Sequence, residues 1–155
     1  MSKTSTTPIA TGMTAELRLS YIPNHQVPRV QIRESKNAVD YLRQVWSDNL
    51  NYLETFYIVH MDRSNHTTGW TMISQGGMHG TLVDIKVVCQ HAVKSGCCAI
   101  LLAHNHPSGN KLASREDIAI TKKIVEACKN LEIKVFDHVI LTEESYYSLV
   151  DEGHM

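Results

Sequence analysis

The most informative stretch of the sequence for the fold is AILLAHNHPSG at residues 99–109, which is followed by Ser114 and Asp117. An apolar run of this kind is typical of a buried strand, and alternate side chains of a strand point to the same face. His104 and His106 therefore aim their imidazoles at one point where the strand leaves the core. The Pro-Ser-Gly turn reverses the chain, so a helix that begins near Ser114 returns the Asp117 carboxylate to that point.

These three side chains predict a metal site. Two neutral imidazoles and one carboxylate are the protein ligands of a catalytic zinc ion that keeps its fourth position for water. We therefore expect one zinc ion per chain, held by His104, His106 and Asp117. Zinc brings the pKa of its bound water to about 7, so a carboxylate is a sufficient base to take the proton and later deliver it to a leaving group. The pattern predicts a hydrolytic metal centre.

Two glutamates are candidates for that base. Glu116 is next to Asp117, but a helix turns successive side chains apart by about 100°, so Glu116 points away from the metal. Glu54 lies at the start of a hydrophobic strand, where an acid beside Leu53 and Phe56 is unusual unless it has a partner. Glu54 is therefore the better candidate.

Ser114 has two candidate roles. As a helix N-cap it would accept a hydrogen bond from the amide near Asp117, in a Ser-x-x-Asp capping pattern. As a catalytic residue its hydroxyl would donate to the oxyanion that develops on an attacked carbonyl. A hydroxyl both donates and accepts, so the two roles are compatible. The local sequence by itself favours the cap.

The periodicity of the apolar residues predicts an alternation of strands and helices. Strands are expected at 16–22, 53–61, 67–74, 97–103 and 134–141. Helices are expected at 35–46, capped by Ser35, at 83–95, ended by Gly96, and at 114–130, with Ile120, Ile124, Cys128 and Leu131 inward, and a last helical turn at 146–150. This order predicts an α/β fold, a three-layer α-β-α sandwich with a mixed β-sheet between the helices.

The composition fits a chain with one sizeable core. It has 155 residues, with 15 Lys and Arg against 16 Asp and Glu and a formal net charge of −1. We expect residues 1–15 to form a flexible N-terminal tail and residues 16–155 a single domain. The balanced charge argues against broad electrostatic attraction to DNA or to anionic membranes, which usually leaves a basic stripe.

The sequence lacks the apolar segments that would direct a protein to a membrane or to secretion. No apolar stretch is long enough to cross a bilayer, and the N-terminus lacks the hydrophobic core of a secretory signal, so we expect a cytoplasmic protein without a membrane partner. The cysteines lack the spacing of a structural zinc site. We expect them to be small buried apolar side chains in a reducing compartment: Cys89, Cys97, Cys98 and Cys128.

Together these residues resemble a known family motif. Glu54, then His104-x-His106, then Ser114-x-x-Asp117 is similar to the JAMM (JAB/MPN+) metalloprotease motif, and LLAHNHPSG at 101–109 resembles its bacterial RadC-like branch in particular. The resemblance covers residues 35–150. Its further points of likeness are Glu54-Thr55-Phe56 with Asp62 downstream, Gly80-Thr81 before the second helix, and Asp137-His138-Val139-Ile140 after the third.

The resemblance implies a JAB/MPN architecture, similar to the cytidine-deaminase-like α/β sandwich, with zinc on His104, His106 and Asp117. It also implies that Glu54 holds and deprotonates the zinc-bound water. It favours the catalytic role of Ser114, which would assist the tetrahedral intermediate. The implied function is that of a zinc-dependent metallohydrolase, a JAMM-type peptidase or isopeptidase that acts on a peptide or protein substrate.

Two other functions are weighed against this one. The first is a catalytically weak RadC-like binding module in a DNA-repair or mobile-element complex, which salt-sensitive DNA affinity without peptide cleavage would favour. The second is a metal-dependent nuclease, which is disfavoured because two-metal phosphodiesterases present more carboxylates than this site offers. Exposed strand edges leave room for a homodimer.

Other polar residues are expected to act outside the metal. His60 at a strand end and His91 on a helix are expected to make structural hydrogen bonds. His79 lies in a glycine-rich loop that could border the substrate. Asp137 and His138 are expected to pack or to support the ligands rather than bind the metal. Substrate specificity is expected to come from the loops at 74–81 and 110–113.

Overall fold

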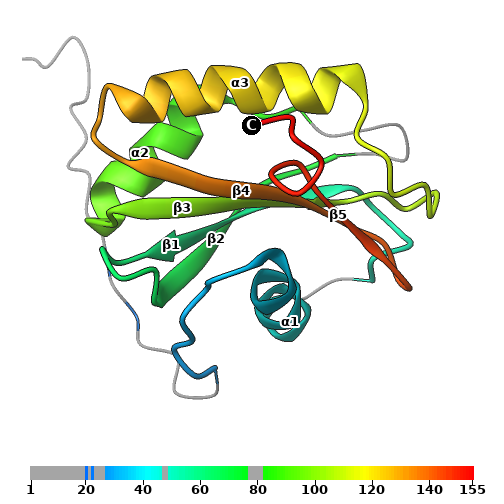
Figure 1. Ribbon diagram of the computed structural model, residues 1–155, viewed down its shortest axis with the longest axis horizontal. Coiled ribbons are helices and arrows are strands. Elements are labelled where there is room, and N and C mark those ends of the chain that lie inside the picture. Colours follow the sequence, from blue (N-terminus) through cyan, green and yellow to red (C-terminus); the bar gives the residue numbers. More distant parts are fainter. Residues whose placement is uncertain (1–19, 21, 23–26, 47–48, 77–81) are drawn as a thin grey trace, which may run out of the picture.

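A five-stranded sheet forms the middle layer of the structure, a computed structural model that describes residues 20, 22, 27–46, 49–76 and 82–155 (Figure 1). Its strands are β1 (Thr55–Met61), β2 (Thr67–Gln75), β3 (Ala99–Asn105), β4 (Lys134–Leu141) and β5 (Tyr146–Ser148), in the order β2-β1-β3-β4-β5. β3 and β4 run parallel, and the other neighbouring pairs are antiparallel. The predicted mixed sheet is confirmed.

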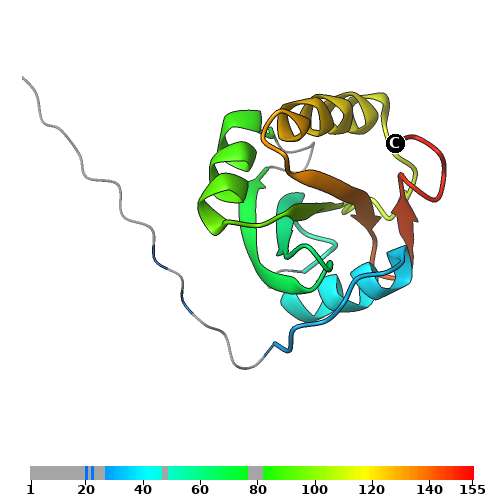
Figure 2. The same cartoon turned by 60° about the vertical axis from the view of Figure 1, so that its left-hand side comes forward.

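Helices cover both faces of this sheet. α1 (Ser35–Val45) packs on one face, and α2 (Ile85–Ser95) and α3 (Arg115–Lys129) pack on the other (Figure 1, Figure 2). The side chains of β3 alternate between the two: Leu101 and Ala103 face α1, whereas Ile100 and Leu102 face α2 and α3. All seven residues of β3 are buried, as a strand covered on both faces requires. The three-layer α-β-α sandwich is confirmed.

The β3–α3–β4 unit positions the candidate site. Parallel neighbours need a crossover, and α3 provides it. The chain leaves the carboxyl end of β3 at Asn105, passes through the loop 106–114 and returns as α3, whose first turn lies over that strand end (Figure 1). Ligands in open α/β sheets bind at such carboxyl ends. His104 lies at the end of β3, His106 begins this loop, and Asp117 lies in the first turn of α3.

A β-bulge in β4 changes which of its side chains face α3. Ile100 pairs with Val135, but Leu102 pairs with His138, so β4 takes three steps where β3 takes two. Because paired residues of adjacent strands share a face, the extra residue turns His138 toward the α3 side. Without the bulge, strict alternation from Val135 would have placed Asp137 there instead.

Two local expectations about element ends are wrong. Ser35 does not cap α1: the N-cap is Glu34, which makes no side-chain capping hydrogen bond, and Ser35 is already helical. Residues 146–150 do not begin with a helical turn, because Tyr146–Ser148 forms β5, antiparallel to β4. The hairpin is closed by Thr142, whose amide donates to the Ser145 carbonyl at 2.9 Å. A three-residue strand forms because it pairs with β4, and local periodicity does not predict such pairing.

Two expectations about burial are also corrected. Leu131 is 42% exposed, because α3 ends at Lys129 and Leu131 lies in the turn that follows. Cys98 is exposed as well, because it precedes β3 rather than lying within it. Among the other cysteines, Cys128 is buried, and Cys89 and Cys97 are half-buried.

Parts of the sequence interpretation fall outside the described residues. These are the tail 1–15, nearly all of the strand expected at 16–22, and His79 with most of its loop. None of the helices in the described part of the chain combines the length and the apolar character that a membrane span requires.

Candidate metal centre

The end of β3 brings two imidazoles together. His104 is the penultimate residue of β3 and His106 follows the strand, so both side chains leave it on the same face. Their Nε2 atoms lie 2.9 Å apart, and the ring centroids are 4.7 Å apart. Phe56 of β1, which pairs with His104, stacks on its ring with a centroid distance of 6.0 Å. The convergence predicted from the alternation of the strand is confirmed.

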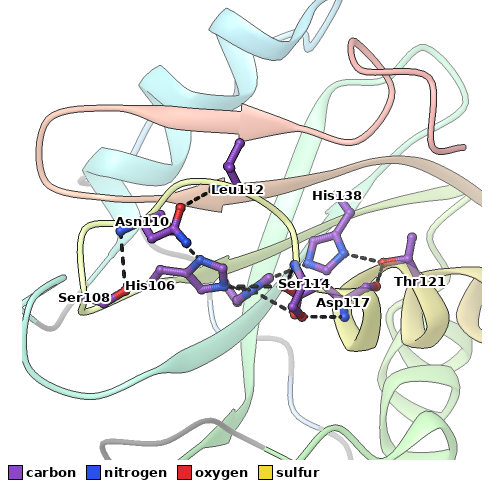
Figure 3. A network of polar contacts seen from close by, with 9 residues as sticks. His106, Ser108, Asn110, Leu112, Ser114, Asp117, Thr121 and His138 are labelled. Carbon is purple, nitrogen blue, oxygen red and sulfur yellow. Dashed lines mark hydrogen bonds and ion pairs between the residues drawn. The ribbon is translucent and has the colours of Figure 1, made fainter.

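The first turn of α3 adds a carboxylate to this pair. Asp117 Oδ1 lies 3.3 Å from His104 Nε2. Asp117 Oδ2 lies 3.5 Å from His106 Nε2, and Figure 3 shows the Asp117 and His106 side chains next to each other. Ser114 and Asp117 form a capping box: the Asp117 amide donates to Ser114 Oγ at 3.0 Å, and the Ser114 amide donates to Asp117 Oδ2 at 2.7 Å. The predicted cap is confirmed, and the same box fixes the direction of the carboxylate.

The three side chains fit a tetrahedral metal ion. One ligand atom from each lies within 4.8 Å of the others. Ligands about 2.1 Å from a tetrahedral zinc ion are spaced about 3.4 Å apart, and the pairwise distances of 2.9, 3.3 and 3.5 Å are close to that spacing. The His104 side chain is 2% exposed, while those of His106 and Asp117 are 15% and 16% exposed. The group is therefore anchored in the core and open to solvent on one side.

Charge in this group matches a cation site. Burial raises the pKa of Asp117, but the neighbouring imidazoles of His104 and His106 outweigh burial and hold this pKa far below its usual range. Burial lowers the pKa of His106, while Asp117, the carbonyl of Asn110 and the charge of Glu54 raise it, and the net shift is upward. The site thus holds an ionised carboxylate and attracts positive charge.

Glu54 lies at the same end of the sheet. It immediately precedes β1, where Phe56 pairs with His104 in the antiparallel ladder. Continuing that register by two residues puts Glu54 opposite His106. Glu54 is half-buried, its charge acts on the pKa of His106, and its carbonyl accepts a hydrogen bond from the Gly76 amide at 2.8 Å. The strand register thus puts the predicted base opposite His106, at the edge of the metal group, which consists of His104, His106 and Asp117.

Asn105, which the sequence interpretation treated as a spacer, clamps the segment that carries Glu54. Its side chain is buried and points away from the two histidines. Its Oδ1 accepts from the amide and hydroxyl of Thr55 at 2.8 and 3.0 Å. Its Nδ2 donates to the carbonyls of Leu50 and Leu53 at 2.8 Å each. A buried amide between two candidate ligands was the available signal for this role.

Two further buried residues stand behind His104. His104 Nδ1 lies 2.8 Å from His138 Nε2. His138 Nδ1 in turn lies 2.5 Å from Thr121 Oγ1, a contact drawn in Figure 3. The expectation that His138 does not join the metal group is met. Thr121 was missed, although its place one helical turn after Asp117 could have suggested it. Asp137 is buried and accepts from Ser148 Oγ at 2.6 Å, so it packs as expected.

The remaining candidates lie away from the metal group. Glu116 is exposed in the first turn of α3, as expected for a residue turned away from Asp117. His60 bonds to Thr71 and Ser95, and His91 Nδ1 donates to the Val87 carbonyl, so both make the expected structural hydrogen bonds. These contacts are 2.8, 3.0 and 2.9 Å long.

Comparison with known proteins identifies the family of this chain. A model of the RadC-like JAB domain matches residues 32–154. A UPF0758 protein of Flavobacterium johnsoniae is 37% identical over 123 residues, which cover 79% of this chain and 53% of that protein. A UPF0758 protein of Syntrophomonas wolfei is 33% identical over 140 residues, which cover 89% of this chain and 59% of that protein.

A third relative, a UPF0758 protein of Geotalea uraniireducens, is 40% identical over 102 residues, which cover 66% of this chain and 45% of that protein. This chain thus spans between 45% and 59% of the length of these relatives. The family match extends from Ile32, three residues before α1, to His154 and includes His104, His106 and Asp117. The chain belongs to the RadC-like JAB domain family.

Proposed function

We propose that this chain is a zinc-dependent metallohydrolase that cleaves peptide or isopeptide bonds. The observation that carries the proposal is the convergence of His104, His106 and Asp117 at the spacing of a tetrahedral zinc site. Membership of the JAB domain family supports it, because that superfamily includes hydrolases. The proposed substrate is a peptide or a protein.

Each side chain has a distinct part in the proposed reaction. His104, His106 and Asp117 would hold a zinc ion, which would supply Lewis acidity and bring the pKa of water to about 7. Glu54 takes a proton from the attacking water and delivers it to the leaving amine. Its place opposite His106, at the solvent-exposed side of the group, suits this transfer.

Ser114 is proposed to act on the carbonyl oxygen of the substrate. Its Oγ accepts the Asp117 amide, so the hydroxyl hydrogen is left to donate in another direction. The side chain is exposed and lies beside the carboxylate of Asp117 (Figure 3). Donation from this hydroxyl to the developing oxyanion would lower the barrier. The cap and the catalytic role are thus compatible in one residue.

A substrate screen with matched glutamate variants tests the proposal. The zinc-loaded chain is incubated with peptide and isopeptide libraries, and new termini are detected by mass spectrometry. Glu54→Gln should keep zinc but lose turnover by about 100-fold or more, because an amide does not accept a proton in this way. Glu116→Gln, which changes an exposed acid of α3, should cleave like wild type. Full activity of Glu54→Gln would refute the assigned base.

A wild-type protein that takes up zinc but cleaves nothing would contradict the hydrolase proposal itself. The same preparation is therefore tested with a DNA duplex at several salt concentrations. Salt-sensitive DNA affinity without peptide cleavage would favour a binding module instead.

A further inference from the structure

His104 presents one ring nitrogen to the metal group and the other to the core. Its Nε2 lies 3.3 Å from Asp117 Oδ1, while its Nδ1 lies 2.8 Å from His138 Nε2. A neutral imidazole carries a hydrogen on one nitrogen and a lone pair on the other. A metal needs the lone pair on Nε2. His104 can therefore bind a metal only when its ring hydrogen is on Nδ1.

The direction of the hydrogen bonds is fixed at Thr121. Thr121 Oγ1 lies 2.5 Å from the main-chain carbonyl of Asp117, which only accepts, so the hydroxyl donates there. That donation uses its single hydrogen. Thr121 Oγ1 therefore accepts from His138 Nδ1, which lies 2.5 Å away.

The same direction continues through His138 to His104. His138 is 0% exposed, and a ring buried this deeply carries a single hydrogen, because burying a charge is costly. With its hydrogen on Nδ1, its Nε2 holds a lone pair and accepts from His104 Nδ1. His104 then has its own lone pair on Nε2, the nitrogen that faces the metal group.

We propose that Thr121 and His138 are positioning residues that hold His104 in the form whose Nε2 lone pair faces the metal. The inference rests on the proposed zinc site and adds to it a hydrogen-bonded relay across α3, β4 and β3. The β4 bulge puts His138 on the correct face, and the turn of α3 that begins with the ligand Asp117 also supplies Thr121.

Burial makes this relay hard to replace. His104 and Thr121 are each 1% exposed, and His138 is 0% exposed, so bulk water does not reach the gap left by a lost partner. His106 is oriented in a simpler way, because its Nδ1 donates to the Asn110 carbonyl at 2.6 Å in the exposed loop (Figure 3). Loss of Thr121 or His138 is therefore expected to change the position of the ring hydrogen of His104.

Zinc titration of threonine variants tests the relay. Thr121→Val keeps the shape of the side chain but leaves His138 Nδ1 without an acceptor. We expect zinc, measured against a competing chelator, to bind about 10- to 100-fold more weakly, the usual effect of removing a residue that orients a ligand. Thr121→Ser restores the hydroxyl and should restore wild-type affinity. Thr67→Val is the matched control, since Thr67 is equally buried but lies where β2 pairs with Met61 at the far end of β1.

Nitrogen-15 NMR of the His138 ring gives a second readout that does not depend on zinc. The relay places the hydrogen on His138 Nδ1 in wild type and in Thr121→Ser. In Thr121→Val the hydrogen should move toward Nε2, because a valine methyl accepts nothing. A purely structural role for Thr121 would leave this signature unchanged.

The outcomes separate the relay from the zinc proposal. A wild-type protein that binds no zinc refutes the zinc site, and the ring signature then decides the relay alone. Wild-type zinc affinity in Thr121→Val, or a His138 hydrogen on Nε2 in wild type, overturns the relay. Should circular dichroism show that Thr121→Val does not fold, His138→Leu removes the acceptor of His104 Nδ1 and must weaken zinc binding by the same factor for the relay to stand.

Discussion

At the scale of single residues, Asn105 uses its whole hydrogen-bonding capacity inside the protein. Its amide makes two donor and two acceptor contacts to the segment 50–55, and it is fully buried. Because this segment carries Glu54, the amide couples the candidate base to the strand that carries both candidate histidine ligands. The stability of the protein and the geometry of its site therefore depend on the same side chain.

Asn105→Leu should destabilise the protein. The Thr55 amide and the carbonyls of Leu50 and Leu53 lose their partner, and each buried unsatisfied group costs about 1–3 kcal/mol. We expect the free energy of unfolding in urea to fall by about 2 kcal/mol or more. Asn130→Leu, at the exposed end of α3, should stay within about 0.5 kcal/mol of wild type. Equal losses in the two variants would contradict the clamp.

His60 predicts how stability depends on pH. Burial, with a smaller contribution from His91, lowers its pKa from 6.5 to about 4. Between these values the unfolded chain binds a proton that the folded protein does not, so stability falls as pH drops from 6.5 toward 4. The shift corresponds to about 3 kcal/mol in all.

Urea unfolding of His60→Gln at several pH values checks this. The variant should lose part of the wild-type decrease between pH 6.5 and 4, since glutamine does not titrate. At about pH 7.5 the His60 ring is neutral in both the folded and the unfolded protein. Measurements at this pH therefore isolate the packing cost of the substitution. An identical pH dependence in the two proteins would show that His60 is not the group involved.

At the scale of elements, the start of α3 is both a cap and part of the metal group. Ser114 closes the capping box, and the residue that completes it is Asp117. Two different demands on the sequence therefore coincide in one helical turn, which explains why the Ser-x-x-Asp spacing is informative from sequence alone. The start of α1 has no such arrangement, because its N-cap Glu34 makes no side-chain capping hydrogen bond.

Ser114→Ala and Ser35→Ala form a matched pair for this difference. Ser114→Ala should cost about 1 kcal/mol of unfolding free energy, the usual loss for a side-chain cap. Ser35→Ala should change it by less than about 0.5 kcal/mol, because Ser35 is helical and does not cap. Chemical denaturation of both variants decides the point. A larger loss in Ser35→Ala would contradict the observed cap assignments.

Elements with strong apolar periodicity were predictable, and those defined by a neighbour were not. The strand over Lys134–Leu141 was predicted with its correct bounds. By contrast, β5 is three residues long and exists through its pairing with β4. The β4 bulge likewise depends on the register between two strands. No local sequence pattern therefore predicted that His138 would face His104.

At the scale of the whole molecule, the site is built from segments far apart in the sequence. The grouping of His104, His106 and Asp117 was predictable because the three candidate ligands are close in the chain. Glu54 is on another strand, and its placement came from an unusual acid beside apolar residues and from the family resemblance. For Asn105 the apolar run suggested a buried amide, but its partners could not be identified from sequence because they are about 50 residues away.

Net charge makes a prediction about nucleic acid for the molecule as a whole. With 15 basic and 16 acidic side chains, the chain lacks the excess of positive charge that drives non-specific DNA binding. Fluorescence anisotropy of a short labelled duplex at about 0.15 M salt should show no saturation at protein concentrations on the order of 10 µM. Saturable binding that weakens steeply with added salt would contradict this expectation.

The proposed hydrolase needs a metal ion bound by His104, His106 and Asp117. The measurement is the number of zinc ions bound per chain after the metal is stripped and the protein is titrated with zinc. We predict one zinc ion in wild type and in His66→Ala, whose histidine lies in the β1–β2 turn, and none held tightly in His104→Ala or His106→Ala. A wild-type protein that binds no zinc, or unchanged binding in the His104 and His106 variants, would contradict the account.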